Sequence, residues 1–309
     1  MELEFGYHRF TFSGSYSDLI HNVQESISSN LGQLPIVEGV RFVGSNSLQR
    51  KIEECRVIDL DVQVLIRSRK FSDYQIVLNS ISHSVEFTLP DTGDNLASIS
   101  TIHGLYKPLP LEKGSRLFIH VVVADKKRYL EIDPSIRYSW KKYKPSLGSF
   151  TDVDNQSISP TLNDVFHGPE GIVYYIKCID SGYARLGILD KSVDQEVKET
   201  VIEVMEPSIL HELFTSSVVY NYRNLCRALG ILNEKLNNFE LIKKENGVLW
   251  DAHNILTPIE VEALEKSIKS KYRLRNGMLQ EVDPINLSIL KNNSLTFLKS
   301  ISERFDILE

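Results

Sequence analysis

Residues 56–70, RVIDLDVQVLIRSRK, indicate the fold class through a strict alternation of apolar and polar side chains. The apolar positions are Ile58, Leu60, Val62, Val64 and Ile66, and the polar ones are Asp59, Asp61, Gln63, Arg67 and Arg69. Successive side chains on a β-strand point to opposite faces of its sheet. The alternation therefore predicts a strand with one buried and one polar face, as is typical of an antiparallel sheet.

Other segments in the first part of the chain also have the composition of strands. We predict further strands at Gln75–Leu78, Ser84–Leu89, Arg116–Ala124, Tyr129–Ile132, Ile172–Ile179 and Tyr183–Leu189. Turn signals near Lys126 and at residues 180–182 join two pairs of these strands as hairpins. One early helix is predicted from the capping pattern at residues 15–18, and it ends near Gly32.

Helical spacing replaces the alternation in the second part of the chain. We predict helices over residues 192–207 and 208–230, each with apolar residues on one face. The strongest start signal is Thr257, Pro258 and Glu260, which combine an N-cap, a proline in the first turn and a capping glutamate.

Two more helices are predicted to begin at Asp283 and at Ser294. Grouped strands followed by grouped helices predict an α+β fold rather than a doubly wound parallel sheet. We expect an antiparallel β-rich N-terminal part, residues 1–190, followed by a helical C-terminal part, residues 191–309. The segment 145–171 lacks periodicity and is predicted to be irregular and flexible.

The composition is that of a folded globular protein: 309 residues are 42% hydrophobic and 25% charged, with a net charge of -6. No run of about 18 apolar residues is present, so we expect no membrane partner. The N-terminal MELEFGYHRF lacks the basic and apolar regions of a signal peptide. Cys55, Cys178 and Cys226 are far apart and predict no disulfide framework. These observations together favour a cytoplasmic protein.

Familiar cofactor and nucleophile motifs are missing from the sequence. It contains no glycine-rich loop of the ATP, GTP or dinucleotide type and no G-x-S-x-G turn. We therefore expect no bound cofactor and no hydrolase of the serine type.

Asp59 and Asp61 support one enzymatic alternative. Two carboxylates on one strand face are typical of metal-dependent nucleases and hydrolases. The usual E-x-K partner is absent, because Gln63 and Val64 occupy the following positions. His120 lies within the apolar stretch LFIHVVV and is interpreted as a packed sheet residue rather than a ligand. A metal-dependent hydrolase or nuclease with dispersed acidic residues is thus the second hypothesis.

The stretch 137–144, RYSWKKYK, concentrates positive charge and aromatic rings in an acidic protein. Cations neutralise phosphates, and aromatic faces stack on unpaired bases, so this mixture favours single-stranded nucleic acid. The alternative is a solvated surface loop. The predicted nucleic-acid-binding residues are Arg137, Tyr138, Trp140, Lys141, Lys142 and Lys144, with Lys269, Lys271, Arg273 and Arg275 as a second phosphate-contacting set.

The last segment of the sequence, LKSISERFDILE, keeps apolar residues where polar ones are usual. We predict that it packs into a groove of a neighbouring copy as an exchanged arm, which makes the protein a homo-oligomer. The predicted oligomerisation residues are Leu298, Ile301, Phe305, Ile307 and Leu308.

The sequence therefore favours a non-enzymatic, self-assembling protein that binds single-stranded nucleic acid, with RNA favoured over DNA. Alanine is scarce and Ser, Ile, Asn and Leu are abundant, as in proteins encoded by AT-rich genomes such as those of many viruses. A viral non-structural or scaffold protein therefore fits this description. A protein-interaction module without nucleic acid is the third hypothesis.

Overall fold

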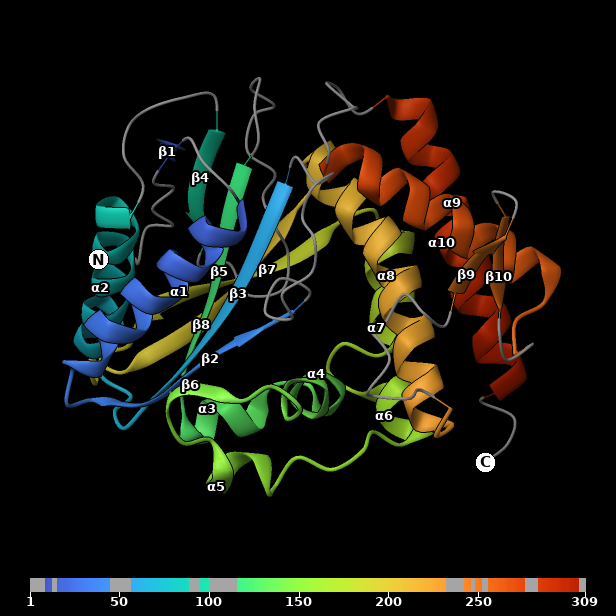
Figure 1. Cartoon of the computed structure of the whole chain (residues 1–309). Coiled ribbons are helices and arrows are strands. Elements are labelled where there is room, and N and C mark those ends of the chain that lie inside the picture. The colour runs from blue at the N-terminus through green and yellow to red at the C-terminus, as the bar shows by residue number, and fades with distance from the viewer. Residues whose placement is uncertain are drawn as a thin grey trace. The chain divides into compact units, whose positions relative to one another are not determined.

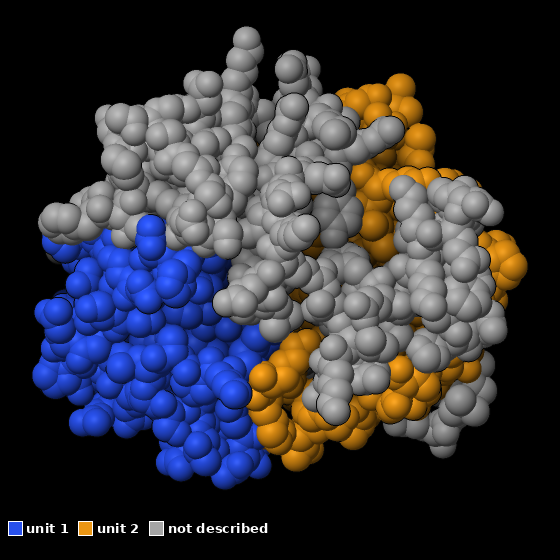
Figure 2. Space-filling view, viewed as in Figure 1, with its two compact units in different colours: residues 1–131, 143–156, 186–202 blue, residues 132–142, 157–185, 203–309 orange. Residues whose placement is uncertain are grey.

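The computed structural model describes residues 9–12, 16–44, 57–88, 95–100, 116–231, 242–245, 248–251, 255–275 and 283–305. The chain forms two compact units, which Figure 2 distinguishes by colour. Unit 1 comprises residues 1–131, 143–156 and 186–202, and unit 2 comprises residues 132–142, 157–185 and 203–309. The sequence analysis placed one boundary near residue 190, whereas each unit is assembled from three segments.

Unit 1 is built on a six-stranded sheet with the order β1-β4-β5-β3-β2-β6 (Figure 1). The strands are β1 (Arg9–Phe12), β2 (Val37–Val43), β3 (Val57–Ile66), β4 (Asn95–Ser100), β5 (Arg116–Asp125) and β6 (Pro145–Gly148). The pairs β1–β4, β2–β3 and β2–β6 are antiparallel, as expected. The central pairs β3–β5 and β4–β5 are parallel, which corrects the expectation of a purely antiparallel sheet.

The parallel pairing has a local cause in helix α2 (Phe71–Thr88), which follows β3. Strands were predicted at residues 75–78 and 84–89, and this prediction was wrong. A parallel connection needs a crossover of a dozen or more residues, and α2 provides it. Phe71, Tyr74, Val77 and Ile81 are all buried at helical spacing, so the tertiary core overrides the β-branched composition.

Helix α1 (Tyr16–Gly32) confirms the predicted early helix, and it packs beside α2. Together they cover one face of the sheet (Figure 1). The core between helices and sheet takes the alternate positions 60, 62, 64 and 66 of β3 and 119, 121 and 123 of β5. These β3 positions are the ones that the sequence alternation predicted to be buried.

The opposite face of the sheet is packed by short helices of unit 1. Helix α3 (Lys126–Glu131) lies against β3 and β5, and α5 (Thr151–Asp154) packs on α3. The predicted strand at residues 129–132 is therefore wrong, and the turn near Lys126 is a helix start rather than a hairpin. The segment 145–171 holds β6, α5 and α6 (Leu162–His167), so it is more regular than its sequence suggested.

A two-stranded sheet of β7 (Ala184–Lys191) and β8 (Val197–Val204) replaces the helix predicted from Ser192. The connection is a tight turn in which the amide of Gln195 donates to the carbonyl of Ser192 at 3.0 Å. Gln195 has φ 64°, a left-handed conformation that no right-handed helix includes. The valine spacing in this segment matched a helix by chance.

Unit 2 is mainly helical, as predicted for the second part of the chain. Its helices are α4 (Pro134–Trp140), α6 (Leu162–His167), α7 (Ile172–Ser181), α8 (Pro207–Ala228), α9 (Pro258–Arg275) and α10 (Pro284–Phe305). Strands β9 (Ile242–Glu245) and β10 (Val248–Asp251) form an antiparallel pair. Helices α8 and α9 confirm the predictions, whereas the two helices predicted from Asp283 and Ser294 form the single helix α10.

Helix α7 corrects a predicted strand at residues 172–179. Its aromatic and β-branched residues favour a strand by composition, but Ile172, Cys178 and Ile179 are buried on one helical face. Gly182, with φ 77°, ends the helix, and the amide of Tyr183 donates to the Cys178 carbonyl at 3.1 Å. The residues 180–182, interpreted as a hairpin turn, are thus a helix C-terminus.

The start of α9 is fixed by Glu260, a fully buried carboxylate. Its Oε2 accepts from the Thr257 amide at 2.7 Å, and the Glu260 amide donates to Thr257 Oγ1 at 3.4 Å, so the predicted capping box is confirmed. The same carboxylate accepts from Ser300 and Arg304 of α10, each at 2.6 Å. One side chain therefore joins the first turn of α9 to the last turns of α10.

No helix within the described ranges is long and apolar enough to cross a membrane. The α+β fold class predicted from the sequence is confirmed.

Candidate functional site

The sheet of unit 1 has a polar face on the side opposite α1 and α2. We define this polar face by Arg41 of β2, Asp61 and Gln63 of β3, and His120 of β5. Arg41 and Gln63 are buried, and Asp61 and His120 are partly buried, with side chains 23% and 15% exposed. Charged and polar groups at the centre of a sheet are unusual, so each needs a partner or a purpose.

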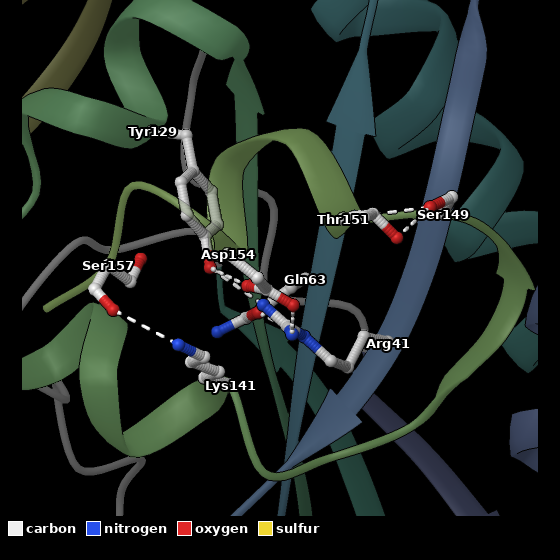
Figure 3. Close-up of polar contacts among 8 residues, drawn as sticks. All are labelled: Arg41, Gln63, Tyr129, Lys141, Ser149, Thr151, Asp154 and Ser157. Atoms are coloured by element: carbon white, nitrogen blue, oxygen red, sulfur yellow. Dashed lines mark hydrogen bonds and ion pairs between the residues drawn. The ribbon is translucent and has the colours of Figure 1, made fainter.

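One end of the polar face is closed by the Arg41 network (Figure 3). The fully buried guanidinium of Arg41 forms an ion pair with Asp154 at 2.8 Å. Its Nη2 donates to the Tyr129 hydroxyl at 2.6 Å, and its Nε donates to Gln63 Oε1 at 3.0 Å. The group also lies 4.2 Å from the ring centroid of Phe150. We call these five residues the Arg41 network.

The positive charge of Arg41 is compensated within the Arg41 network. A buried guanidinium is tolerated only when its charge and its donors find partners, and here a carboxylate, a hydroxyl, an amide and an aromatic face supply them. The partners come from β3, α3, α5 and the residue before α5, so the network fastens these short elements to the sheet. Its role is structural.

The other end of the polar face is centred on Asp61. We call it the open end, because the Asp61 side chain is partly exposed there. The Asp61 Oδ1 lies 3.1 Å from His120 Nδ1 on the neighbouring parallel strand. Asp61 is paired with Val43, the last residue of β2, so β2 leaves the sheet at this level. The carboxylate is therefore held in place while it stays partly exposed to solvent.

Gly44 forms the second wall of this open end. It has φ 82°, a conformation that favours glycine, and a Cβ at this position would lie 2.3 Å from Asp61 Oδ2. Any larger residue would displace the Asp61 carboxylate. Glycine at position 44 thus gives the Asp61 carboxylate room beside the backbone.

Gln63, two residues beyond Asp61, carries a donor that the protein itself does not use. Because Oε1 accepts from Arg41, the amide orientation is fixed, and Nε2 has no hydrogen-bond partner among the described residues. The side chain is only 2% exposed. An unsatisfied buried donor costs roughly 1–3 kcal/mol, which a ligand or a water molecule would offset.

The open end offers one described carboxylate, that of Asp61, as a ligand for a hard divalent cation. In the described part of the chain, no group of three or more His, Cys, Asp or Glu residues gathers closely enough to hold a metal ion. Mg²⁺, however, is commonly bound through one or two carboxylates, waters and substrate phosphates. Asp61 is one such carboxylate. Asp59 occupies the β3 position opposite Phe118, two residues earlier on the same strand.

The predicted nucleic-acid-binding stretch lies on and after α4. Arg137 is buried, Tyr138, Trp140 and Lys142 are partly buried, and Lys141 and Lys144 are exposed. Lys141 Nζ donates to the Ser157 carbonyl at 3.4 Å (Figure 3). The stretch therefore does not present its charges and rings as one uniformly exposed row. Nucleic-acid binding by these residues stays a prediction.

The second predicted set lies on α9 and is largely compensated where its side chains are described. Lys269 forms an ion pair with Glu265, one turn earlier on the helix. Lys271 lies 3.3 Å from Glu212 and donates to Ser216 at 2.7 Å. Arg273 and Arg275 belong to the last turns of α9, and their side chains lie outside the described residues.

Among the predicted oligomerisation residues, Leu298 and Ile301 are fully buried within the single chain. They belong to the face of α10 that packs on α8 and α9, so they contribute to the core of unit 2. Phe305 is partly buried, and Ile307 and Leu308 lie outside the described residues. The homo-oligomer stays a prediction.

The described cysteines do not provide a reactive nucleophile. Cys178 and Cys226 are free and buried. Burial raises the pKa of the Cys178 thiol, which keeps it protonated at neutral pH. Cys55 lies outside the described residues.

Comparison with protein-family models, with curated proteins and with solved structures found no match. Function therefore rests on the geometry of this chain's own side chains. The sequence pattern placed Asp59, Asp61 and Gln63 on one polar face and dismissed His120, whereas Gly44 and Arg41 were missed. The signal for Arg41 was available: it is the one cation within the apolar stretch VEGVRFV.

Proposed function

We propose that the protein is a metal-dependent phosphoryl-transfer enzyme whose reaction centre is the open end of the polar face. The observation that carries this proposal is the Asp61 carboxylate, partly exposed, fixed by His120 and placed against Gly44 where β2 leaves the sheet. The sequence alone favoured a non-enzymatic protein. The arrangement of the polar face now favours the hydrolase and nuclease class over it, because a partly exposed carboxylate fixed by a histidine is the kind of ligand that such enzymes use.

The proposed centre assigns a role to each residue of the open end. Asp61 would hold a divalent cation, which neutralises charge on phosphate oxygens and lowers the pKa of bound water. His120 orients the Asp61 carboxylate through its Nδ1 contact. Gly44 leaves room for the Asp61 carboxylate beside its backbone.

The substrate class proposed is a phosphate ester of a nucleotide or nucleic acid. Such a substrate completes the coordination of Mg²⁺ through its own oxygens, which a site with few protein carboxylates requires. Uncharged esters and peptides lack the negative oxygens that Mg²⁺ prefers, so they would bind this cation more weakly.

The direct test incubates the protein with nucleoside triphosphates, single-stranded RNA and single-stranded DNA in MgCl2 or MnCl2, and separates the products by chromatography. We expect turnover that requires the divalent cation and falls roughly 100-fold or more in Asp61→Asn, because loss of a metal ligand removes several kcal/mol of charge stabilisation. In His120→Ala we expect a fall of about 10–100-fold, typical of a residue that orients a ligand.

The matched control is Asp152→Asn, which removes an exposed carboxylate of unit 1 that pairs with Lys126 at 3.2 Å. It should keep full activity. Mn²⁺ binding measured by electron paramagnetic resonance gives a second readout without turnover. Equal Mn²⁺ affinity in the wild type and in Asp61→Asn would contradict the assignment of the centre.

Single-stranded RNA binding is the second candidate function, favoured by the exposure of Lys141 and Lys144 on either side of partly exposed rings. We expect the triple change of Lys141, Lys142 and Lys144 to Ala to reduce the salt slope of binding by about 0.7 per lost phosphate contact. Trp140→Ala should weaken binding and leave that slope unchanged. Fluorescence anisotropy at several salt concentrations measures both, and identical slopes in the wild type and the triple variant would remove this candidate.

A further inference from the structure

Arg137 on α4 is a buried cation whose hydrogen bonding is incomplete. Its side chain belongs to a residue that is 8% exposed. Its Nε donates to the Ile132 carbonyl at 2.9 Å, but Nη1 is buried and has no hydrogen-bond partner among the residues that the structure describes. A guanidinium presents five donors and stays charged at every pH that proteins tolerate.

No acidic side chain among the described residues lies within 4.0 Å of Arg137. The nearest acid along the chain, Asp133, lies four residues earlier, and its oxygens serve other groups. Its Oδ1 accepts from the Tyr220 hydroxyl at 3.2 Å, and its Oδ2 accepts from the Glu170 amide at 3.4 Å. The position of Arg137 in the last turn of α4 offsets little of its charge, because a short helix end contributes only a fraction of an elementary charge.

Burial of a charge without a counter-charge lowers stability, and replacement by an apolar side chain of similar size usually raises it. A residue that persists under such a cost is typical of a functional position rather than of the core. The missing partner of Arg137 is an anion with oxygens that match the planar fork of the guanidinium.

We propose that Arg137 binds a phosphate group of a ligand. Lys141, four residues later and exposed, lies on the same side of the chain's helical path and supplies a second positive charge. Its weak contact to the Ser157 carbonyl, at 3.4 Å, is readily exchanged for a phosphate oxygen. This inference concerns unit 2 alone and does not depend on the proposed reaction centre.

The phosphate belongs either to a free nucleotide or to a nucleic-acid backbone, since both present the same oxygens. Three probes separate these sources: pyrophosphate, ATP without divalent cation, and a 12-residue single-stranded RNA. Pyrophosphate tests the anion site itself. A preference for ATP or for RNA over pyrophosphate then identifies the larger ligand.

The experiment measures the thermal midpoint of unfolding and the affinity by titration calorimetry for the full chain. The variants are Arg137→Met, Arg137→Lys and the control Lys177→Met, which removes an exposed charge of α7 that belongs to no predicted binding set. Sodium chloride at equal ionic strength controls for screening. A ligand that binds the folded state raises its midpoint in proportion to affinity and concentration.

We expect pyrophosphate to raise the midpoint of the wild type and of Lys177→Met above the chloride control. Affinity should fall about tenfold or more in Arg137→Met, because a charge-assisted hydrogen bond is lost, and Arg137→Lys should recover only part of it. No rise over chloride in the wild type, or equal rises in the wild type and both Arg137 variants, would overturn the proposal. Arg137→Lys keeps the test decisive if Arg137→Met does not fold.

Discussion

Arg41 and Arg137 are two buried arginines in different units, and their surroundings differ in a way that separates structure from function. Arg41 has a carboxylate, a hydroxyl, an amide oxygen and an aromatic face as partners. In the described part of the chain, Arg137 has one carbonyl oxygen as its hydrogen-bond partner. Both residues have the same intrinsic donors, so the difference lies in what the fold provides around them. A complete partner set marks a structural cation, and an incomplete one marks a cation that awaits a ligand.

A third buried basic side chain, His211 of α8, avoids an uncompensated charge in another way, because it can lose its proton. It is 1% exposed, its Nε2 lies 2.7 Å from Ser270 Oγ, and burial lowers the pKa of its imidazole below the ordinary 6.5. The neighbouring Glu212 opposes this shift only in part. Histidine can lose its proton when buried and arginine cannot. The three buried basic side chains thus differ: Arg41 is paired, His211 is neutral at ordinary pH, and Arg137 is proposed to bind a ligand.

The largest expected effect in this comparison is that of Arg41→Met. It leaves the Asp154 carboxylate without its partner, so we expect the free energy of unfolding to fall by about 3–5 kcal/mol. Arg137→Met should leave the same quantity unchanged or raise it. Urea unfolding followed by circular dichroism measures both. Equal losses of unfolding free energy in the two variants would contradict the proposed difference between the two arginines.

A smaller effect is expected for Tyr129→Phe, which keeps the ring and removes the hydroxyl that accepts from Arg41. The loss should be about 1.5–3 kcal/mol, the range for a hydrogen bond to a charged group. Tyr138→Phe is the matched control, because it removes a hydroxyl from a partly buried ring outside the Arg41 network. If Tyr129→Phe unfolds at the same urea concentration as the wild type, the hydroxyl does not contribute to the network.

The smallest effect concerns pH and His211. Since the folded-state pKa is depressed, the unfolded chain takes up this proton first as the pH falls below about 6.5. Stability is therefore full above that pH and decreases as the pH is lowered toward the folded-state pKa. His211→Gln should make this decrease shallower, whereas His21→Gln, at an exposed position of α1, should not. Unfolding midpoints at pH 7.5, 6.5 and 5.5 measure the difference.

Local signals made parts of the fold predictable from the sequence. The starts of α1 and α9 follow from capping residues within a single turn, and β3 follows from alternation within ten residues. The failures at α2, α3 and α7 share a cause: tyrosine, valine and isoleucine favour strands by composition, and only their burial on one helical face reverses this preference. The parallel direction of β3 and β5 depends on a crossover and could not be read locally.

The candidate site was only half predictable for a similar reason. Asp59 and Asp61 stand out because the strand alternation aligns them. His120 joins them through pairing between strands 59 residues apart in sequence, and the contribution of Gly44 depends on a backbone angle. In the stretch 137–144, charge and aromatic content were visible, but the burial of Arg137 was not. Composition reveals which polar and charged groups the chain contains, and packing decides which of them are buried without hydrogen-bond or ion-pair partners.

The buried carboxylate of Glu260 has a consequence for how unit 2 opens. Because it caps the first turn of α9 and accepts from Ser300 and Arg304, the two helix ends gain or lose these contacts together. Arg304 also donates to the Ile255 carbonyl at 2.9 Å, which adds the segment before α9 to the same group. In amide hydrogen exchange, residues 258–261 and 300–304 should then behave as one cooperative opening unit, although about 40 positions separate them along the chain.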